Sequence, residues 1–311
     1  MNYTILGVMM HSECNAACDI CSVSCSPQCK EELNVDRIKE IIESSINTSI
    51  KYVALTGGEP FLKYERVKDL VTYTKKCGLK ASVVTNGFWA DSYNDTLDTL
   101  KELKELGLER INISCDHHHL KYVKMQNINN ILLASDKVGL PHVVAAVKTR
   151  GEKLGGLIDQ FDENIFDLKL IVAPCQPVGR AKLSYSQEDF VTPVEPRNMT
   201  CPHGGTVTIY YDGNIYPCCS HHIFDSSLSI GHYLDLNMEQ ILYKIKNNSL
   251  LYVLRNYGID PLLDMNPMVK EQLDEHVSCP CEVCAKLLSG NIGGYVADVN
   301  QFLKDKTIKA I

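Results

Sequence analysis

The sequence lacks the features that would point to a membrane, an export pathway or a nucleic acid. It contains no apolar run of about 18 residues, so no segment is expected to span a bilayer. The N-terminus, Met1-Asn2-Tyr3, leads directly into an expected strand and does not resemble a basic, apolar signal sequence. The net charge of -7 gives no support for nucleic-acid binding. No internal repeat or low-complexity tract is present.

The chain is long enough for one full-sized domain with a smaller one appended. It has 311 residues, of which 45% are hydrophobic, and this is ample for a buried core. Fourteen residues are cysteines, which cluster at spacings typical of metal ligands. Because no export signal accompanies them, we expect a protein of the reducing cytosol rather than a disulfide framework.

Three of the cysteines form a tight run directly after an expected strand. Cys14, Cys18 and Cys21 are spaced C-x3-C-x2-C and can converge on one iron–sulfur cube. A cube normally takes four thiolates, so three ligands leave one iron open to hold a small molecule. A zinc knuckle or a redox loop uses similar spacing and is the alternative.

A second motif, Gly57-Gly58-Glu59-Pro60, ends the apolar run at residues 52–55. Glycines let the backbone approach a ligand closely, although the same residues also suit an ordinary turn before a helix that Pro60 would begin. Together with the cysteine run, the motif resembles the signature of the radical S-adenosylmethionine (SAM) enzymes. The resemblance implies that the open iron chelates SAM and that the Gly-Gly-Glu-Pro backbone receives its ammonium group.

Apolar runs alternate with amphipathic stretches up to about residue 185. The expected strands cover residues 4–10, 51–55, 81–85, 110–114, 142–148 and 167–172, and the expected helices cover residues 35–46, 63–77, 95–106, 127–138 and 154–161. Six such units predict an α/β fold with parallel strands. The resemblance narrows this to the partial (β/α)6 TIM-like barrel of radical SAM enzymes, whose chemistry lies at the carboxyl ends of the strands.

Polar residues at further strand ends are candidates for binding SAM. Asn86 follows the third strand, Ser114 ends the fourth, and Asp116 lies two residues beyond it. They can hydrogen-bond the methionine carboxylate and the ribose hydroxyls, or form an ordinary turn and a helix cap. Arg180 lies in a Gly-Arg-Ala turn that resembles one found in many radical SAM enzymes, and it can pair with a SAM or substrate carboxylate.

Other conspicuous residues are expected to have no direct part in the chemistry. His117, His118 and His119 are consecutive and therefore point in different directions, so they cannot all bind one ion. We expect them at the surface or in a substrate groove. Cys25 and Cys29 continue the early cysteine spacing and are expected to be structural.

A polar segment with two prolines predicts a domain boundary. We expect a barrel over residues 1–190, a linker over residues 191–200 and a smaller domain over residues 201–311. In the last part, residues 206–211 and 214–216 flank Asp212-Gly213 and predict a β-hairpin. This part resembles the twitch or shortened SPASM extension, a hairpin-plus-helix module that holds an auxiliary [4Fe–4S] cluster.

The resemblance implies a set of four ligands for the auxiliary cluster: Cys201, Cys218, Cys281 and Cys284. Cys279 is the alternative to Cys281, and a structural zinc site is the alternative to the cluster. Cys219 follows Cys218 on an extended segment, where adjacent side chains point to opposite sides, so we expect it to face the barrel mouth. A thiol there can donate a hydrogen atom to a carbon radical; a buried apolar cysteine is the alternative.

Three blocks, at residues 86–89, 211–220 and 251–255, resemble the radical SAM peptide epimerases of the YydG type. The resemblance implies conversion of L-residues to D-residues in a ribosomally synthesised peptide. A radical derived from SAM removes a Cα hydrogen, and Cys219 returns one from the opposite face. The implied partners are SAM, two [4Fe–4S] clusters, the precursor peptide and an electron donor such as flavodoxin or ferredoxin.

Two observations leave alternatives to this function. The family pattern has an acidic residue at about the position of Thr206, so this chain lacks that acidic group and departs from the pattern there. A radical SAM enzyme that forms a thioether or carbon–carbon cross-link shares every motif except the donor thiol, and an electron carrier or sensor would share the clusters. No separate leader-binding module precedes the expected barrel, so either the barrel groove or a partner is expected to present the peptide.

Overall fold

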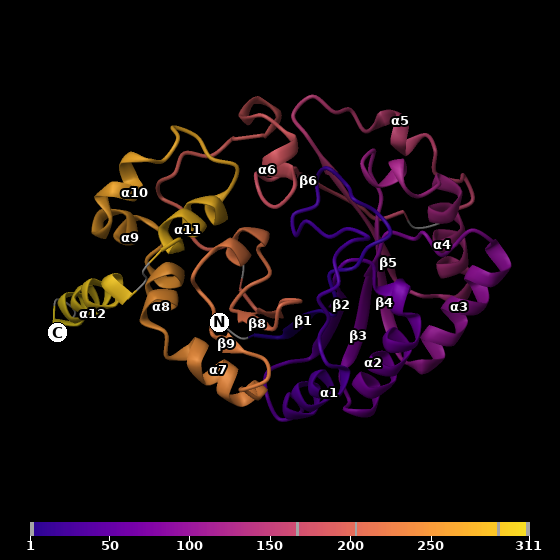
Figure 1. Cartoon of the computed structure of the whole chain (residues 1–311), viewed down its shortest axis with the longest axis horizontal. Coiled ribbons are helices and arrows are strands. Elements are labelled where there is room, and N and C mark those ends of the chain that lie inside the picture. Colours follow the sequence, from indigo (N-terminus) through magenta and orange to yellow (C-terminus); the bar gives the residue numbers. More distant parts are fainter. Residues whose placement is uncertain (1–2, 166–167, 203, 291–292, 309–311) are drawn as a thin grey trace.

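A nine-stranded sheet forms the centre of the computed structural model, which describes residues 3–165, 168–202, 204–290 and 293–308 (Figure 1). The strands follow the spatial order β6-β5-β4-β3-β2-β1-β7-β8-β9. They are β1 (Ile5–Met9), β2 (Tyr52–Thr56), β3 (Lys80–Thr85), β4 (Leu108–Ser114), β5 (His142–Lys148), β6 (Leu170–Pro174), β7 (Thr206–Ile209), β8 (Asn214–Tyr216) and β9 (Gly231–His232). The pairs from β6 to β1 are parallel, as the alternation of strands and helices predicts.

Helices connect the parallel strands and lie along the outer side of the sheet (Figure 1). They are α1 (Val35–Ser44), η1 (Pro60–Lys63), α2 (Tyr64–Lys76), α3 (Tyr93–Leu106), η2 (His119–Lys121), α4 (Met125–Val138) and α5 (Gly155–Ile158). Local signals fix their ends. Asn34 caps α1 by accepting a hydrogen bond from the backbone of Arg37, and Gly139 ends α4 in a left-handed conformation.

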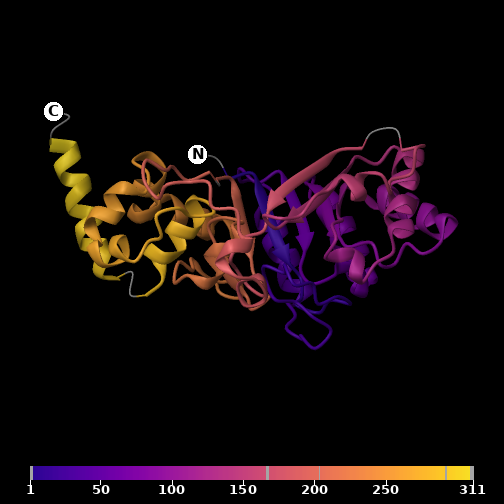
Figure 2. The same ribbon diagram turned by 90° about the horizontal axis from the view of Figure 1, so that it is seen from above.

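The second half of the chain is mostly helical and extends away from the barrel on the side of the hairpin (Figures 1 and 2). Its helices are α6 (Ala181–Ser184), η3 (Gln187–Asp189), η4 (His221–Asp225), α7 (Met238–Lys246), α8 (Ser249–Asn256), α9 (Asp260–Met265), α10 (Pro267–Glu271), α11 (Pro280–Leu288) and α12 (Gly293–Ile308). Asparagine side chains cap three of them, Asn237 before α7, Asn248 before α8 and Asn266 before α10.

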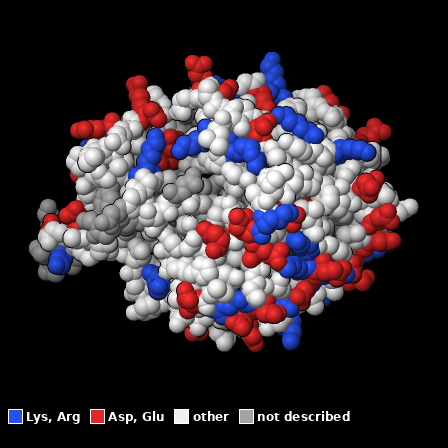
Figure 3. Space-filling view, viewed as in Figure 1, with Lys and Arg blue, Asp and Glu red and all other residues white. Residues whose placement is uncertain are grey.

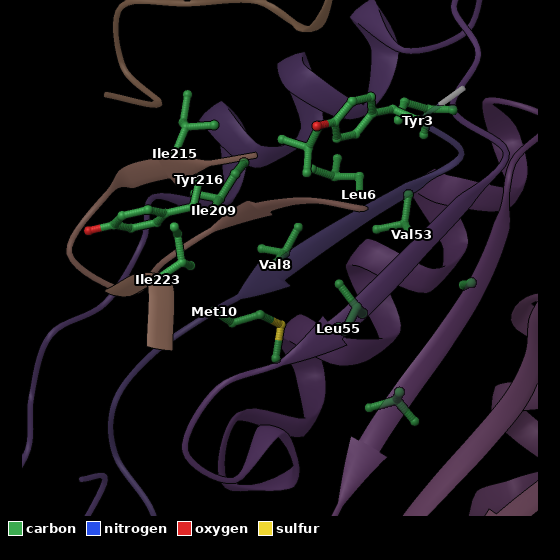
Figure 4. Close-up of a cluster of buried hydrophobic side chains, with 14 of the residues drawn as sticks. Tyr3, Leu6, Val8, Met10, Val53, Leu55, Ile209, Ile215, Tyr216 and Ile223 are labelled. Atoms are coloured by element: carbon green, nitrogen blue, oxygen red, sulfur yellow. The ribbon is translucent and has the colours of Figure 1, made fainter. Parts of the chain in front are cut away.

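The side-chain alternation along the strands separates the core from the site. Leu6 and Val8 of β1 are fully buried in the apolar core, where they meet side chains of β2 and of the β7–β8 hairpin (Figure 4). The alternate residues Ile5, Gly7 and Met9 face the other way and line a cavity. The two-residue period of a strand therefore places one face of β1 in the core and the other in the site.

The structure confirms the expected α/β class and partial barrel, with most boundaries shifted by one to three residues. The sixth strand runs from Leu170 to Pro174 instead of covering residues 167–172, and residue 167 lies outside the described residues. The hairpin, however, is not separate from the barrel sheet, because β7 pairs in parallel with β1. Residues 191–200 are irregular, with one bridge between Val194 and Val277. The division into a barrel, a linker and a smaller domain stays a prediction.

The surface agrees with the mildly acidic composition. On the face drawn in Figure 3, basic and acidic side chains are interspersed, and no extended basic area is visible among the described residues. Within the same residues, the longest helices fall short of the length and apolar character that crossing a membrane requires.

Candidate functional site

The carboxyl ends of the barrel strands and the β7–β8 hairpin surround a cavity of about 540 Å³, large enough for a small organic ligand. It brings together residues that are far apart in the sequence. Those with polar or sulfur groups include Cys14, Cys18, Cys21, Cys25, Gly57, Gly58, Glu59, Asn86, Ser114, His119, Thr206, Thr208 and Cys219. Most of the residues predicted for the cluster and for SAM therefore share one cavity with the predicted donor thiol.

The three thiols of the cysteine run differ in their electrostatic surroundings. Burial raises the pKa of Cys14 and of Cys18 to about 12, so these thiols need a positive partner such as iron to ionise. A hydrogen bond from the Cys25 thiol lowers the pKa of Cys21 to about 6. Cys25, expected to be structural, thus contacts a predicted cluster ligand directly.

No three His, Cys, Asp or Glu side chains among the described residues are gathered tightly enough to hold a single metal ion. The thiolates of a cube bind different iron atoms and need not meet at one point. The cavity wall also offers a donor to a ligand sulfur, since the Asn86 side-chain amide lies 3.8 Å from the Cys14 Sγ. The buried thiols, this donor and the open cavity fit a [4Fe–4S] cluster with SAM beside it.

Both glycines of the Gly57-Gly58 pair are required by close approach to the segment that follows β1. A Cβ on Gly57 would lie 2.5 Å from the His11 carbonyl oxygen, and one on Gly58 would lie 1.9 Å from the Glu13 carbonyl oxygen. The Gly58 N–H donates to the His11 carbonyl and the Glu59 N–H donates to that of Glu13. The motif therefore holds the start of the cysteine loop, and its backbone also lines the cavity.

The Glu59 carboxylate is buried and joins two strand ends. It accepts hydrogen bonds from the Thr85 hydroxyl, from the Asn86 N–H and from the Phe61 N–H, which it caps at the start of η1. Burial raises the pKa of Glu59 to about 7, although these donors oppose the shift. Pro60 occupies the first turn of η1. Glu59 thus positions Asn86, whose amide in turn donates to Asn15 in the cysteine loop at 2.8 Å.

Asp116 is fully buried, and its carboxylate is occupied by protein donors. It accepts hydrogen bonds from the backbone N–H groups of His118, His119 and Val147, and from the His119 Nδ1. It does not line the cavity. The Asp116 carboxylate is thus engaged in the turn before η2, and its contact with the ribose of SAM stays a prediction, whereas Ser114 does reach the cavity.

The three consecutive histidines point to three different partners, as expected. His117 contacts the Lys153 carbonyl, and His118 pairs with Glu152. Only His119 reaches the cavity, held by Asp116 at 2.9 Å. Burial opposes the charged form of His119, but the hydrogen bond and the charge of Asp116 raise its pKa overall.

Arg180 holds the cysteine loop rather than lining the cavity. Its guanidinium donates to the carbonyl oxygens of Cys18, Ser24 and Cys25 at 2.8–2.9 Å. Its backbone N–H donates to the Cys21 carbonyl. These contacts occupy the Arg180 guanidinium, which was expected to pair with a carboxylate of SAM or of the substrate. The pairing with a carboxylate stays a prediction. Sequence reasoning placed Arg180 in the site but did not predict its bonds to the loop.

A second, smaller cavity lies between the hairpin and the helices of the C-terminal half. Four of its lining residues are the cysteines predicted for the auxiliary cluster: Cys201, Cys218, Cys281 and Cys284. Cys281 and Cys284 are three residues apart on α11 and so share one face of this helix. Burial raises the pKa of Cys218 to about 12 and raises that of Cys284 further. The apolar surroundings and the four thiols fit a second [4Fe–4S] cluster.

The two remaining cysteines of this region do not line the second cavity. Cys279 precedes α11, and its thiol lies 3.2 Å from the Gln176 side-chain oxygen. A hydrogen bond from Cys281 lowers the pKa of Cys279 to about 4. Cys219 is exposed and lines the first cavity. The geometry therefore favours Cys281 over Cys279 as the fourth thiol, and it separates Cys218 from Cys219 as the extended segment predicts.

The comparisons with known proteins agree with this geometry. Residues 8–132 match the model of the radical SAM superfamily, so the chain carries a radical SAM domain. This domain implies SAM and a [4Fe–4S] cluster as cofactors.

One curated relative is similar over nearly the whole chain. It is the "Putative peptide biosynthesis protein YydG" of Bacillus subtilis, 28% identical over 293 residues that cover 91% of this chain and 92% of that protein.

Two solved structures share the fold. SuiB of Streptococcus suis, bound to its precursor peptide SuiA, covers 91% of this chain and 71% of that chain, with a TM-score of 0.61 and 13% identity. The enzyme anSMEcpe, bound to AdoMet and the Cp18Cys peptide, covers 97% of this chain and 99% of that chain, with a TM-score of 0.56 and 12% identity.

The first cavity also has lining residues that were not predicted as parts of the site, among them His119 and Thr208. His119 belongs to a histidine run that gave no hint of which ring faces inward. Thr208 lies on β7, and its buried hydroxyl has no hydrogen-bond partner among the described residues. A threonine two positions after Thr206 on the same strand must face the same side, so the two-residue period could have identified Thr208 once β7 was placed beside β1.

Proposed function

We propose that this radical SAM enzyme is a peptide epimerase that converts L-residues of a ribosomally synthesised peptide to D-residues. One observation carries the proposal. Cys219 lines the first cavity with Cys14, Cys18 and Cys21, while its neighbour Cys218 lines the second cavity with the other three C-terminal thiols. A peptide substrate is supported by the relative whose name refers to peptide biosynthesis and by two structures of the same fold described with bound peptides.

Within this proposal each group has a distinct role. Cys14, Cys18 and Cys21 hold the cluster, and Gly57, Gly58, Glu59, Asn86 and Ser114 hold SAM beside it. Once bound, SAM and the cluster supply the one-electron chemistry that removes a hydrogen atom from a Cα carbon. Cys201, Cys218, Cys281 and Cys284 hold the auxiliary cluster.

Cys219 completes the inversion. Loss of the Cα hydrogen leaves a planar carbon radical that the adjoining amides stabilise, so the original handedness is lost. The Cys219 S–H bond breaks and a new Cα–H bond forms on the opposite face, which leaves a sulfur radical on Cys219. Its return to a thiol takes up one electron and one proton per turnover. An electron donor such as flavodoxin or ferredoxin, in a reducing cytosol, suits this need.

The assay is anaerobic turnover in heavy water with the peptide encoded beside the gene, scored by mass and by chiral analysis of the hydrolysed product. The exchangeable thiol carries deuterium, so each inverted residue should gain about one mass unit. Cross-linking would instead remove about two hydrogens, and an electron carrier would release no deoxyadenosine from SAM.

The Cys219→Ala variant tests the donor directly. It should cleave SAM at the wild-type rate and form no D-residue, because only the return of the hydrogen is blocked. Cys29→Ala is the matched control, since this thiol lies outside both cavities. D-residues formed by Cys219→Ala at the wild-type rate would show that another group donates the hydrogen.

A further inference from the structure

Arg255 lies at the cavity of the four C-terminal thiols. It lies near the end of α8 and lines the cavity together with Cys201, Cys218, Cys281 and Cys284. The other side chains around it there are mostly apolar, including those of Leu251 and Leu254 from the same helix. A guanidinium in such surroundings needs an anionic or hydrogen-bonding partner.

One edge of the Arg255 guanidinium is fixed by protein groups. Its Nη2 donates to the Tyr3 hydroxyl and to the Pro217 carbonyl oxygen, and the Tyr3 hydroxyl itself donates to Pro217 at 2.8 Å. The guanidinium also lies over the Tyr3 ring, 5.0 Å from its centre. The planar group is therefore held in one orientation beside the residue that precedes Cys218.

The Arg255 Nε is different: it is buried, and no partner for its N–H is found among the described residues. An unpaired buried N–H on a cation is costly unless a ligand accepts it. The charge of Arg255 is placed at the thiols, because Arg255 lines the same cavity as Cys218 and Cys284. An iron–sulfur cube with four thiolates carries net negative charge and sulfur acceptors, and hydrogen bonds to those sulfurs tune its reduction potential.

We propose that Arg255 is a positioning residue of the auxiliary cluster, whose Nε–H donates a hydrogen bond to a cluster sulfur and whose charge makes the cluster easier to reduce. Reduction adds an electron to an anionic group, and a nearby cation stabilises the more negative state more strongly. Removing the cation should therefore shift the midpoint potential to more negative values. Tyr3 acts through Arg255 by fixing the orientation of its guanidinium.

The test is a redox titration of the full-length, anaerobically reconstituted protein, followed by electron paramagnetic resonance. Arg255→Met should shift the auxiliary-cluster potential to a more negative value, and Arg255→Lys, which keeps the charge without the Nε–H, should shift it less. The cluster at Cys14, Cys18 and Cys21, identified by its response to SAM, should keep its potential in both variants. Arg150→Met is the matched control, since this exposed arginine lies outside both cavities.

A wild-type potential in Arg255→Met would overturn the proposal, even if that variant were less stable. If Arg255→Met does not fold, Arg255→Lys decides, and a wild-type potential there overturns the hydrogen bond. Tyr3→Phe keeps the ring but loses the hydroxyl, and a small negative shift is expected. The inference rests on the proposed auxiliary cluster and not on epimerisation, and the titration needs no peptide. Wild-type protein with iron for only one cluster would refute the second cluster itself.

Discussion

The Arg180 contacts predict that a residue outside the cavity controls how firmly the first cluster is held. Arg180→Met leaves the carbonyl oxygens of Cys18, Ser24 and Cys25 without their donors. One of these bonds is exposed, so we use the central value of about 1 kcal/mol for an ordinary hydrogen bond instead of the larger value for a charged donor, and three bonds give about 3 kcal/mol. At about 1.4 kcal/mol per factor of ten, local opening of the loop should increase roughly 100-fold.

The assay is the rate at which a ferrous chelator removes iron from the anaerobic holoprotein. Arg180→Met should lose the iron of the first cluster much faster than wild type, while the iron of the auxiliary site leaves at an unchanged rate. Arg180→Lys should be intermediate, because an ammonium cannot reach all three carbonyls at once. The control is Lys182→Met, which removes an exposed cation from the same short helix, α6. If Arg180→Met and Lys182→Met release iron equally fast, Arg180 does not hold the loop.

Two further predictions follow from close packing and from a buried ion pair. Gly58→Ala should abolish SAM binding and reduce the iron content of the first site, because its Cβ would lie 1.9 Å from the Glu13 carbonyl oxygen; Gly155→Ala, with nothing within 4 Å, should bind SAM like wild type. Asp116→Asn should lower the free energy of unfolding by about 3 kcal/mol, the low end for such a pair, since the partly buried His119 ring loses its charged partner. Burial alone would raise the pKa of Asp116, but the hydrogen bonds and charge of His119 lower it overall. Burial alone would lower the pKa of His119, but the hydrogen bond and charge of Asp116 raise it overall. The pair therefore stabilises the wild-type fold between these two pKa values and less on either side, and urea unfolding of Asp116→Asn across pH should show a flatter profile.

The barrel could be predicted from the sequence because its signals are local. Each of the first six strands is an apolar run, and each helix between them has its own periodicity and end signals. The pairing of β7 with β1 could not be predicted in this way, since it joins residues about 200 positions apart and depends on the whole barrel being formed. The short helices from α7 to α11 were not predicted individually, because each is too brief for a clear periodic pattern.

The site shows a similar division. Alternation along an extended chain predicted that Cys218 and Cys219 face opposite sides, and the two line different cavities; the C-x2-C pair favoured Cys281 with Cys284, and both line the second cavity. The roles of Asp116 and Arg180 were harder to predict, because a polar side chain at a strand end can bind either a ligand or the neighbouring backbone. The chain supplies backbone partners for both, and these partners come from elements distant in sequence.

The shared strand β1 has a consequence for the timing of the proposed inversion. β1 leads into the loop of Cys14, Cys18 and Cys21, while its neighbour β7 begins the hairpin that leads to Cys219. The hydrogen-bonded ladder between β1 and β7 thus links the place where the substrate would lose its Cα hydrogen to the Cys219 thiol that would return one. Because both positions depend on this ladder, we expect the planar Cα radical to be quenched soon after it forms, with little return to the starting configuration.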